Sequence, residues 1–271
     1  MPSIHPTAMV DGSAQLADDV EIGPYCIVEA ETCIGEGTRL MSNVIIRRYT
    51  TLGKGNQVHP FSVLGGDPQD LKFDPATRST VVIGDGNVFR ESCTVNRGTG
   101  EGAVTRIGNN NYFMAYAHAG HNVTVGSNAI LVNGSALGGH STVGDRAILS
   151  SHVAVHQFCS VGEMCMGQGN CVTTGHVPPY VIFAGTGQVQ GLNIVGLRRA
   201  EHISREDIKQ IREAFNIFFR RGLPTMRALE EMDACNDWGE PADRFREFIR
   251  KAAGAEGPYK RVIATLRDPR R

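Results

Sequence analysis

The chain has 271 residues, a formal net charge of −1, 32 glycines and only 7% aromatic residues. So small a net charge argues against a protein that binds nucleic acid through its overall electrostatic field, and we expect no nucleic-acid partner. The scarcity of aromatic side chains argues against a thick conventional core and favours a thin, regular one.

No apolar run approaches the ~20 residues that a membrane-spanning helix needs, so we expect no stable membrane insertion. The N-terminus lacks a basic segment followed by an apolar one, so no secretory signal is visible. The seven cysteines form neither a C-x-x-C pair nor a zinc-type spacing with histidine. We therefore expect a cytoplasmic protein with reduced, buried thiols and no metal site.

Aliphatic residues recur every six positions over most of the chain. The series comprises Ile4, Val10, Leu16, Ile22, Val28, Ile34, Leu40, Ile46, Leu52, Val58 and Leu64, then Ile83, Phe89 and Val95, then Ile107, Phe113, Ala119, Val125, Leu131, Leu137, Val143, Leu149, Val155 and Val161. Neither a helix nor a plain strand has this period. A parallel β-helix has it, because each short strand turns one apolar residue inward before a corner.

A glycine follows the inward residue at intervals of eighteen, at Gly108, Gly126, Gly144 and Gly162. Three hexads therefore form one coil of a triangular prism. We interpret these glycines as corner residues that need unusual backbone dihedral angles. The pattern predicts a β-helix over residues 1–190, with insert loops at about 65–81 and 96–106, where binding groups often lie.

The hexad pattern stops near Val177, and helical patterns follow. Ser204 and Asp207 form a capping box before an apolar stretch of helical spacing. Further helices are predicted near residues 225–232 and 242–252. Residues 191–271 are therefore expected to form a small helical subdomain that caps the prism or binds a partner.

One edge of the prism is expected to carry a column of polar side chains. Counted from the start of each coil, five residues fall thirteen to fifteen positions along: Asn96, His121, His140, His156 and His176. Coils stack at ~4.8 Å, so these residues are predicted to line one edge, with His118 nearby. The functional interpretation is a cleft that holds a general base. The alternative is an inert polar edge.

Several motifs in this order resemble one family, the UDP-N-acetylglucosamine O-acyltransferases that begin lipid A assembly. They are Ile4-His5-Pro6-Thr7-Ala8, Gln69-Asp70-Leu71-Lys72, Arg90-Glu91-Ser92, Asn96-Arg97-Gly98-Thr99, His118 with His121, Gly138-Gly139-His140, Ala154-Val155-His156-Gln157-Phe158, Val177-Pro178-Pro179-Tyr180, and Asn193-Ile194 with Gly196-Leu197. The resemblance covers nearly the whole chain.

The resemblance implies a homotrimer of left-handed parallel β-helices with active sites between subunits. It implies transfer of an (R)-3-hydroxyacyl chain from acyl carrier protein to the glucosamine 3-hydroxyl of UDP-N-acetylglucosamine. His121 matches the family's general base, and the backbone N–H of Gly139 matches the group that stabilises the oxyanion. No cofactor is implied beyond the phosphopantetheine thioester of the donor, because a thioester is already activated.

The resemblance also assigns substrate contacts. His118, His140, His156 and Gln157 match cleft residues; Gln69, Asp70 and Lys72 match contacts in the first insert; Asn193 and Arg199 match residues near the nucleotide; and Gly169 lies near the position that limits acyl length. A guanidinium fork such as that of Arg199 suits phosphate oxygens.

The chain departs from the family pattern at three positions. Asn122 stands where many relatives carry Asp, Val195 where they often carry Glu, and Asn96 where others often carry His. An amide at 122 is able to orient His121 but not to neutralise its positive charge. These departures leave open a 3-amino sugar nucleotide as acceptor.

Three other classes of protein remain open on the sequence. The first is a sugar-nucleotide N-acyltransferase that uses acyl-CoA. The second is a zinc enzyme of the γ-carbonic anhydrase type, with His121, His140 and His156 as ligands, although their spacing does not fit that family. The third is a non-catalytic β-helix.

Overall fold

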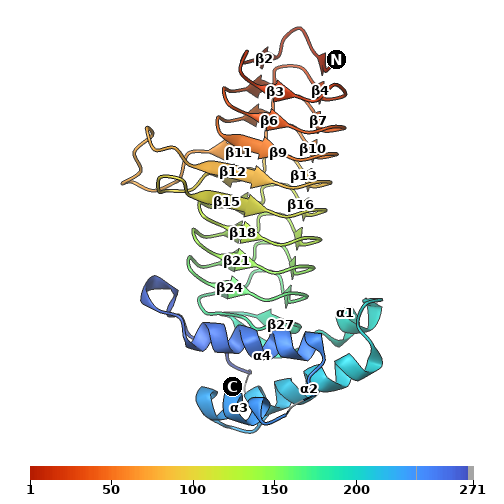
Figure 1. Ribbon diagram of the computed structural model, residues 1–271, viewed down its shortest axis with the longest axis vertical. Coiled ribbons are helices and arrows are strands. Elements are labelled where there is room, and N and C mark those ends of the chain that lie inside the picture. Colours follow the sequence, from red (N-terminus) through yellow and green to blue (C-terminus); the bar gives the residue numbers. More distant parts are fainter. Residues whose placement is uncertain (236, 268–271) are drawn as a thin grey trace.

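The computed structural model describes residues 1–235 and 237–267, and these form a triangular prism with helices at one end (Figure 1). Each hexad of the sequence makes one short strand and one corner. Strands eighteen residues apart pair in parallel, for example Ile130 with Ile148. The described strands form three sheets, here called A, B and C.

The strand bounds follow the repeat. Sheet A contains β1 Ser3–Ile4, β4 Glu21–Ile22, β7 Arg39–Leu40, β10 Gln57–Val58, β13 Val88–Phe89, β16 Tyr112–Phe113, β19 Ile130–Leu131, β22 Ile148–Leu149, β25 Met166–Gly167, β27 Val181–Ala184 and β28 Gln188–Leu192. Sheet B contains β2 Met9–Val10, β5 Ile27–Val28, β8 Ile45–Ile46, β11 Val63–Gly66, β14 Thr94–Asn96, β17 His118–Ala119, β20 Ala136–Leu137, β23 Ala154–Val155 and β26 Val172–Thr173. Sheet C contains β3 Gln15–Leu16, β6 Cys33–Ile34, β9 Thr50–Leu52, β12 Thr80–Ile83, β15 Val104–Ile107, β18 Thr124–Val125, β21 Thr142–Val143 and β24 Ser160–Val161.

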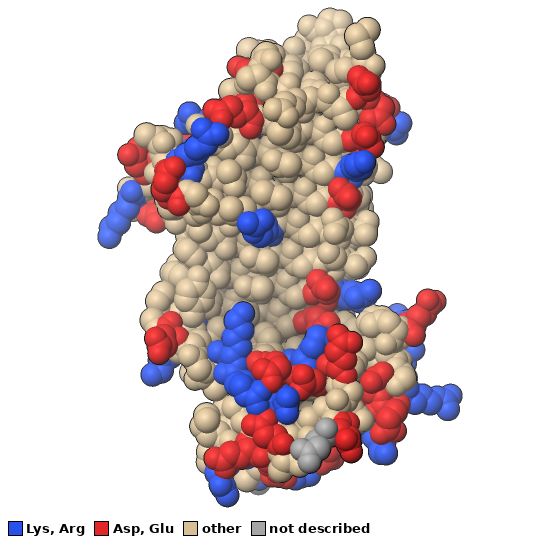
Figure 2. All heavy atoms as spheres, in the orientation of Figure 1, with Lys and Arg blue, Asp and Glu red and all other residues tan. Residues whose placement is uncertain are grey.

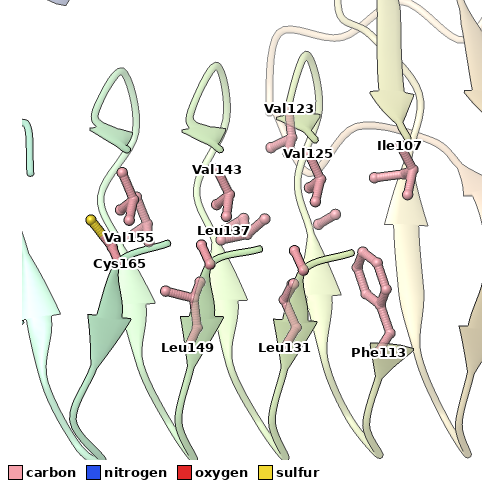
Figure 3. Packing of buried hydrophobic residues seen from close by; sticks show 14 of the residues in the cluster. Ile107, Phe113, Val123, Val125, Leu131, Leu137, Val143, Leu149, Val155 and Cys165 are labelled. Carbon is pink, nitrogen blue, oxygen red and sulfur yellow. The ribbon is translucent and has the colours of Figure 1, made fainter. Parts of the chain in front are cut away.

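Side chains from two positions of each hexad fill the interior, and each kind stacks in columns along the prism. Hexad residues such as Leu131 and Leu149 stack on successive coils, as Figure 3 shows. The second of these positions lies two residues earlier in each hexad and holds small residues, among them Val123 and Cys165. Cys26, Cys93, Cys159, Cys165 and Cys171 occupy it as buried free thiols, whereas Cys33 is partly buried and Cys235 is exposed. The thin core therefore also depends on small residues that stand two positions before the apolar residues of the six-residue series.

The glycines that follow the inward residues are required for space and not for unusual dihedral angles, so that part of the interpretation was wrong. A Cβ on Gly35 would lie 2.7 Å from the backbone of Gly53, and one on Gly144 would lie 2.8 Å from Gly162. The left-handed residues of the corners stand two positions later, and many are not glycine, such as Asn122 (φ 60°) and His140 (φ 60°).

Two inserts leave the prism on one side (Figure 1). The first covers residues 67–79, between β11 and β12, and the second covers residues 97–103, between β14 and β15. Both are shorter than the expected loops because Gly66 still pairs with Asn96 across β11 and β14. Both inserts therefore begin beside each other, at the end of sheet B strands.

The fully buried Arg97 ties the first insert to the prism. Its Nε donates to Asp67 Oδ1 at 3.0 Å, Nη1 donates to the carbonyl of Thr77 at 2.5 Å, and Nη2 donates to the carbonyl of Pro75 at 3.2 Å. Its guanidinium also lies 4.9 Å over the ring of Phe73. One side chain thus satisfies a carboxylate at the start of the insert and two carbonyls near its end.

The helical end begins after an antiparallel pair, β27 with β28. In the described part of the chain the helices are α1 Ile194–Arg199, α2 Arg205–Arg220, α3 Thr225–Asp233, α4 Glu240–Ala253 and the 3-10 turn η1 Gly257–Tyr259. The predicted capping box is present at the start of α2. Of these helices, none is long and apolar enough to cross a membrane.

On the face that Figure 2 shows, charged side chains lie over the inserts, over the helices and along one edge of the coils nearer the N-terminus, whereas the coils between the inserts and the helices carry few. Both signs are mixed there, and many are paired, as Arg246 is with Asp243. On this face the charges do not form a broad basic surface of the kind that binds nucleic acid.

Candidate active site

The candidate site lies where sheet B turns into sheet C. The B–C corner, as we call it, comprises the turns after β17, β20 and β23 (residues 120–123, 138–141 and 156–159). A cleft of about 400 Å³ opens beside it. Its lining includes seven of the residues predicted from the sequence: Gln69, Asn96, His118, His121, Gly139, His156 and Gln157. The prism repeat therefore brings six of these residues together from four coils, and the first insert adds Gln69.

His121 has one ring nitrogen engaged within the subunit. Its Nδ1 lies 2.9 Å from Asn122 Oδ1. That oxygen also accepts from the N–H of Thr99 at 3.1 Å, which fixes the amide with its oxygen toward the histidine. A neutral His121 therefore carries its proton on Nδ1 and leaves the Nε2 lone pair free. This is the protonation state that a general base requires.

Asn122 is itself held firmly. Its backbone N–H donates to Thr105 Oγ1 at 2.8 Å, and its left-handed conformation is one that asparagine tolerates well. The amide orients His121 but brings no negative charge to the imidazolium that forms when the base takes a proton.

Gly139 provides the room for the imidazole of His121. A Cβ at Gly139 would overlap His121 Cε1 and Nε2. The N–H of Gly139 has no hydrogen-bond partner within residues 1–235 and 237–267, so it is free to donate to a bound oxygen. A backbone donor and an unprotonated nitrogen thus lie side by side.

Gly139→Ala is expected to lower kcat at least about 10-fold, because the new methyl displaces the imidazole of His121 from its position beside the donor. Steady-state kinetics on folded protein checks this. Gly12→Ala is the matched control, since nothing lies within 4 Å of a Cβ there. An active Gly139→Ala variant would show that this contact does not set the geometry.

His118 and His140 flank the base and are held neutral. Burial lowers the pKa of both imidazoles below the ordinary 6.5, and the nearby His121 lowers each further. His118 Nδ1 lies 2.8 Å from Thr94 Oγ1. The ring of His140 stacks on Phe158 at 4.7 Å and meets His121 edge-on at 5.2 Å.

These shifts predict that the protein loses stability as pH falls below about 6.5. The unfolded chain binds protons at His118 and His140 in that range, whereas the folded chain does so only below their lowered pKa values. Unfolding temperatures between pH 8 and pH 5 check this. His118→Gln should flatten the dependence, and an unchanged slope would argue against a neutral His118 in the folded state.

The other cleft residues are also partly engaged. Asn96 Nδ2 donates to the carbonyl of Asp67 at 2.6 Å, while its buried Oδ1 has no partner among the described residues. His156 Nδ1 lies 3.1 Å from the carbonyl of its neighbour Gln157. Gln69 is exposed at the mouth of the cleft.

Several predicted contacts lie outside this cleft in a single subunit. Asp70 and Lys72 are exposed on the first insert, where the Lys72 N–H donates to Asp70 Oδ1. Gly169 lies in a turn between sheets A and B. Asn193 caps α1 by accepting from the Gly196 N–H, and Arg199 is exposed on the same helix.

His176 does not lie in the polar column, so its placement from the sequence was wrong. The last coil is shortened, and Val177 already pairs with Val161 of sheet C. The imidazole of His176 is buried, accepts from the Ser160 N–H at Nδ1 and lies 2.9 Å from the carbonyl of Tyr259 at Nε2. It joins the prism to the end of the chain.

The sequence reasoning missed residues that support the site. Thr99 fixes Asn122, and Arg97 holds the insert; both lie in a motif that was noted without a role for either. Tyr259 approaches His140 from the far end of the chain, and no sequence pattern pointed to it. Within the described ranges, no group of three His, Cys, Asp or Glu side chains is placed to hold a metal ion.

Comparison with known proteins bears directly on this geometry. Residues 176–258 match the family described as Udp N-acetylglucosamine O-acyltransferase, Domain 2, and residues 105–139 match the bacterial transferase hexapeptide repeats. The acyl-[acyl-carrier-protein]–UDP-N-acetylglucosamine O-acyltransferase of Stenotrophomonas maltophilia (strain K279a) is 41% identical over 255 residues, 93% of this chain and 96% of that protein. The enzyme of the same name from Pseudomonas putida (strain W619) is 40% identical, over 93% of this chain and 98% of its own.

Solved structures that resemble this chain carry enzyme names closely similar to those of these relatives. The UDP-N-acetylglucosamine O-acyltransferase of Moraxella catarrhalis superposes with a TM-score of 0.89 at 36% identity, covering 96% of this chain and 99% of its own. The UDP-N-acetylglucosamine acyltransferase of Bacteroides fragilis gives 0.88 at 35%, covering 97% and 100%. The predicted left-handed parallel β-helix with a helical C-terminal subdomain is confirmed. The chain belongs to the acyl-[acyl-carrier-protein]–UDP-N-acetylglucosamine O-acyltransferase family.

Proposed function

We propose that this protein transfers a 3-hydroxyacyl chain from acyl carrier protein to the 3-hydroxyl of UDP-N-acetylglucosamine, the first step of lipid A biosynthesis. The observation that carries the proposal is the free Nε2 of His121 beside the free N–H of Gly139. The names of the relatives supply the donor and the acceptor. Because the proposed donor is acyl carrier protein, we infer that the reaction takes place in the cytoplasm.

The reaction follows from these two groups. His121 Nε2 takes the proton of the sugar hydroxyl as its oxygen attacks the thioester carbonyl. The Gly139 N–H stabilises the oxyanion of the tetrahedral intermediate, a contribution typically worth about 3 kcal/mol to the barrier. The C–S bond then breaks, and the imidazolium returns its proton to the leaving thiolate. No cofactor is needed, because the thioester is already activated.

We place the complete site between subunits of a homotrimer. Gly169, Asn193 and Arg199 do not line the cleft of their own subunit, so a second copy is the natural source of these contacts. Phe61 and Tyr116 support this arrangement. They are 63% and 71% exposed at left-handed corner positions, and their uncovered apolar surface is available for a second copy to bury.

The amide at Asn122 favours a second candidate function, acyl transfer to a 3-amino sugar nucleotide as the acceptor. With no carboxylate on His121, the imidazolium formed by the base is less stabilised, and an amine needs less help to attack than a hydroxyl. The product would then be an amide in place of an ester.

Thiol release from the donor tests both the donor and the acceptor. Purified protein is incubated with 3-hydroxyacyl carrier protein or 3-hydroxyacyl-CoA, and with either sugar nucleotide. Release that requires acyl carrier protein and UDP-N-acetylglucosamine supports the proposal. A strong preference for the 3-amino sugar would favour the second candidate, and a preference for the CoA thioester would identify an acyl-CoA-dependent enzyme.

A further inference from the structure

The end of the chain returns from the helices to the B–C corner. The C-terminal strap, as we call residues 257–267, starts with η1 and then runs along the last coil of the prism. Val262 accepts from the His176 N–H, and Ala264 donates to the His176 carbonyl, both at 2.8 Å. The strap is therefore part of the prism wall, although α1 to α4 separate it from the strands in sequence.

Buried His176 fixes the position of Tyr259 within this strap. Its Nδ1 lies 3.2 Å from the N–H of Ser160, so that nitrogen is the acceptor and Nε2 carries the proton. Nε2 then donates to the carbonyl of Tyr259 at 2.9 Å. The imidazole is only 4% exposed. One neutral histidine thus links the backbone of Tyr259 to sheet C.

The side chain of Tyr259 reaches the candidate active site. Its ring meets the ring of Phe158 edge-on, with centroids 5.1 Å apart, and lies 6.2 Å from His140 at a near-perpendicular angle. Its hydroxyl lies 3.2 Å from His140 Nδ1. His140 in turn contacts the proposed base, His121, edge-on. A chain of contacts therefore runs from the strap to the base.

The chemistry of the two groups sets the direction of this hydrogen bond. A phenol is a good donor, and the unprotonated nitrogen of a neutral imidazole is a better acceptor than a phenol oxygen. The second ring nitrogen of His140 then carries the proton. Without the phenol, both tautomers of a neutral imidazole are accessible, and only one of them donates from Nε2.

We propose that Tyr259 is a positioning residue whose hydroxyl donates to His140 Nδ1 and so holds His140 as an Nε2–H donor toward an oxygen of the bound substrates. The proposal rests on the proposed function for what His140 donates to. The state of His140 itself is a property of the protein without substrates. The helical subdomain then does more than cap the prism, because it delivers this tyrosine to the site.

The test compares full-length wild type with Tyr259→Phe, which keeps the ring contacts and removes only the hydroxyl. Nitrogen-15 NMR of histidine-labelled protein, without substrates and at neutral pH, reports the tautomer of each imidazole. His140→Gln assigns the signal. In the wild type we expect a protonated Nε2 and an unprotonated Nδ1 at His140, and in Tyr259→Phe a mixture of both tautomers.

Activity gives the second readout. Loss of one neutral, partly exposed hydrogen bond is expected to lower kcat/KM of Tyr259→Phe by about 3- to 10-fold and to lower the unfolding temperature only slightly. Tyr25→Phe, at an exposed tyrosine near the other end of the prism, is the control and should match the wild type.

Either of two results would overturn the inference. One is a wild-type His140 protonated at Nδ1, and the other is a tautomer that stays the same in Tyr259→Phe. Because the NMR measurement needs no substrate, it decides the role of Tyr259 even when the assay detects no product, an outcome that would count only against the proposed function.

Discussion

His121→Ala is expected to lower kcat by about 10²- to 10⁴-fold, the range that general-base catalysis usually contributes. The reason is specific to this site, since His121 combines a free Nε2 with a position beside Gly139. Steady-state kinetics with acyl carrier protein as donor gives the measurement. KM values should change little, because substrate contacts lie mainly on other residues.

The histidine of the first coil supplies the control for this variant. His5 is exposed, and Thr7 is the one described side chain to which its imidazole is hydrogen-bonded, so His5→Ala should retain full activity. Asn122→Asp extends the test, because a carboxylate in place of the amide would stabilise the imidazolium. A His121→Ala variant that keeps more than about a tenth of the wild-type kcat would rule out His121 as the general base.

Arg97→Met is expected to destabilise the protein by about 3 kcal/mol, since it leaves the Asp67 carboxylate and the carbonyls of Pro75 and Thr77 without their buried partner. The first insert should then be cleaved readily by proteases between residues 67 and 79. Activity should fall as well, because Gln69 reaches the cleft from this insert. The unfolding temperature and limited proteolysis report the two structural effects.

A surface arginine provides the comparison for Arg97. Arg39 pairs with Glu21 at 2.9 Å, but both side chains are more than half exposed, so Arg39→Met should change stability little. Arg97→Lys keeps the charge and loses the fork, and it should recover only part of the stability. If Arg97→Met unfolded at the same temperature as Arg39→Met and its first insert stayed resistant to protease, the structure of the insert would not depend on Arg97.

Much of the fold follows from one repeat in the sequence. Inward residues such as Leu131 and Leu149 stand one coil apart, and parallel pairing at that interval leaves little freedom for the prism. The glycines show where this reasoning was incomplete. Gly35 and Gly144 are needed because a neighbouring coil approaches closely, and that contact exists only once the coils are stacked.

The candidate site was predictable as far as the repeat extends. His121, Gly139 and Gln157 share one corner because they occupy the same position in successive coils. His176 was misplaced because the last coil is shorter than eighteen residues. Tyr259 had no periodic signal at all, since its place depends on how the strap folds back over the prism after four helices.

Whether this protein catalyses the proposed acyl transfer is decided by the identity of the product. Wild-type protein would be incubated with UDP-N-acetylglucosamine and 3-hydroxyacyl carrier proteins of several lengths, and the sugar nucleotides analysed by mass spectrometry before and after mild alkali. We expect a singly acylated UDP-N-acetylglucosamine whose acyl group mild alkali removes, as for an ester at the 3-hydroxyl. Folded wild-type protein that leaves UDP-N-acetylglucosamine unacylated with every donor would contradict the proposed function.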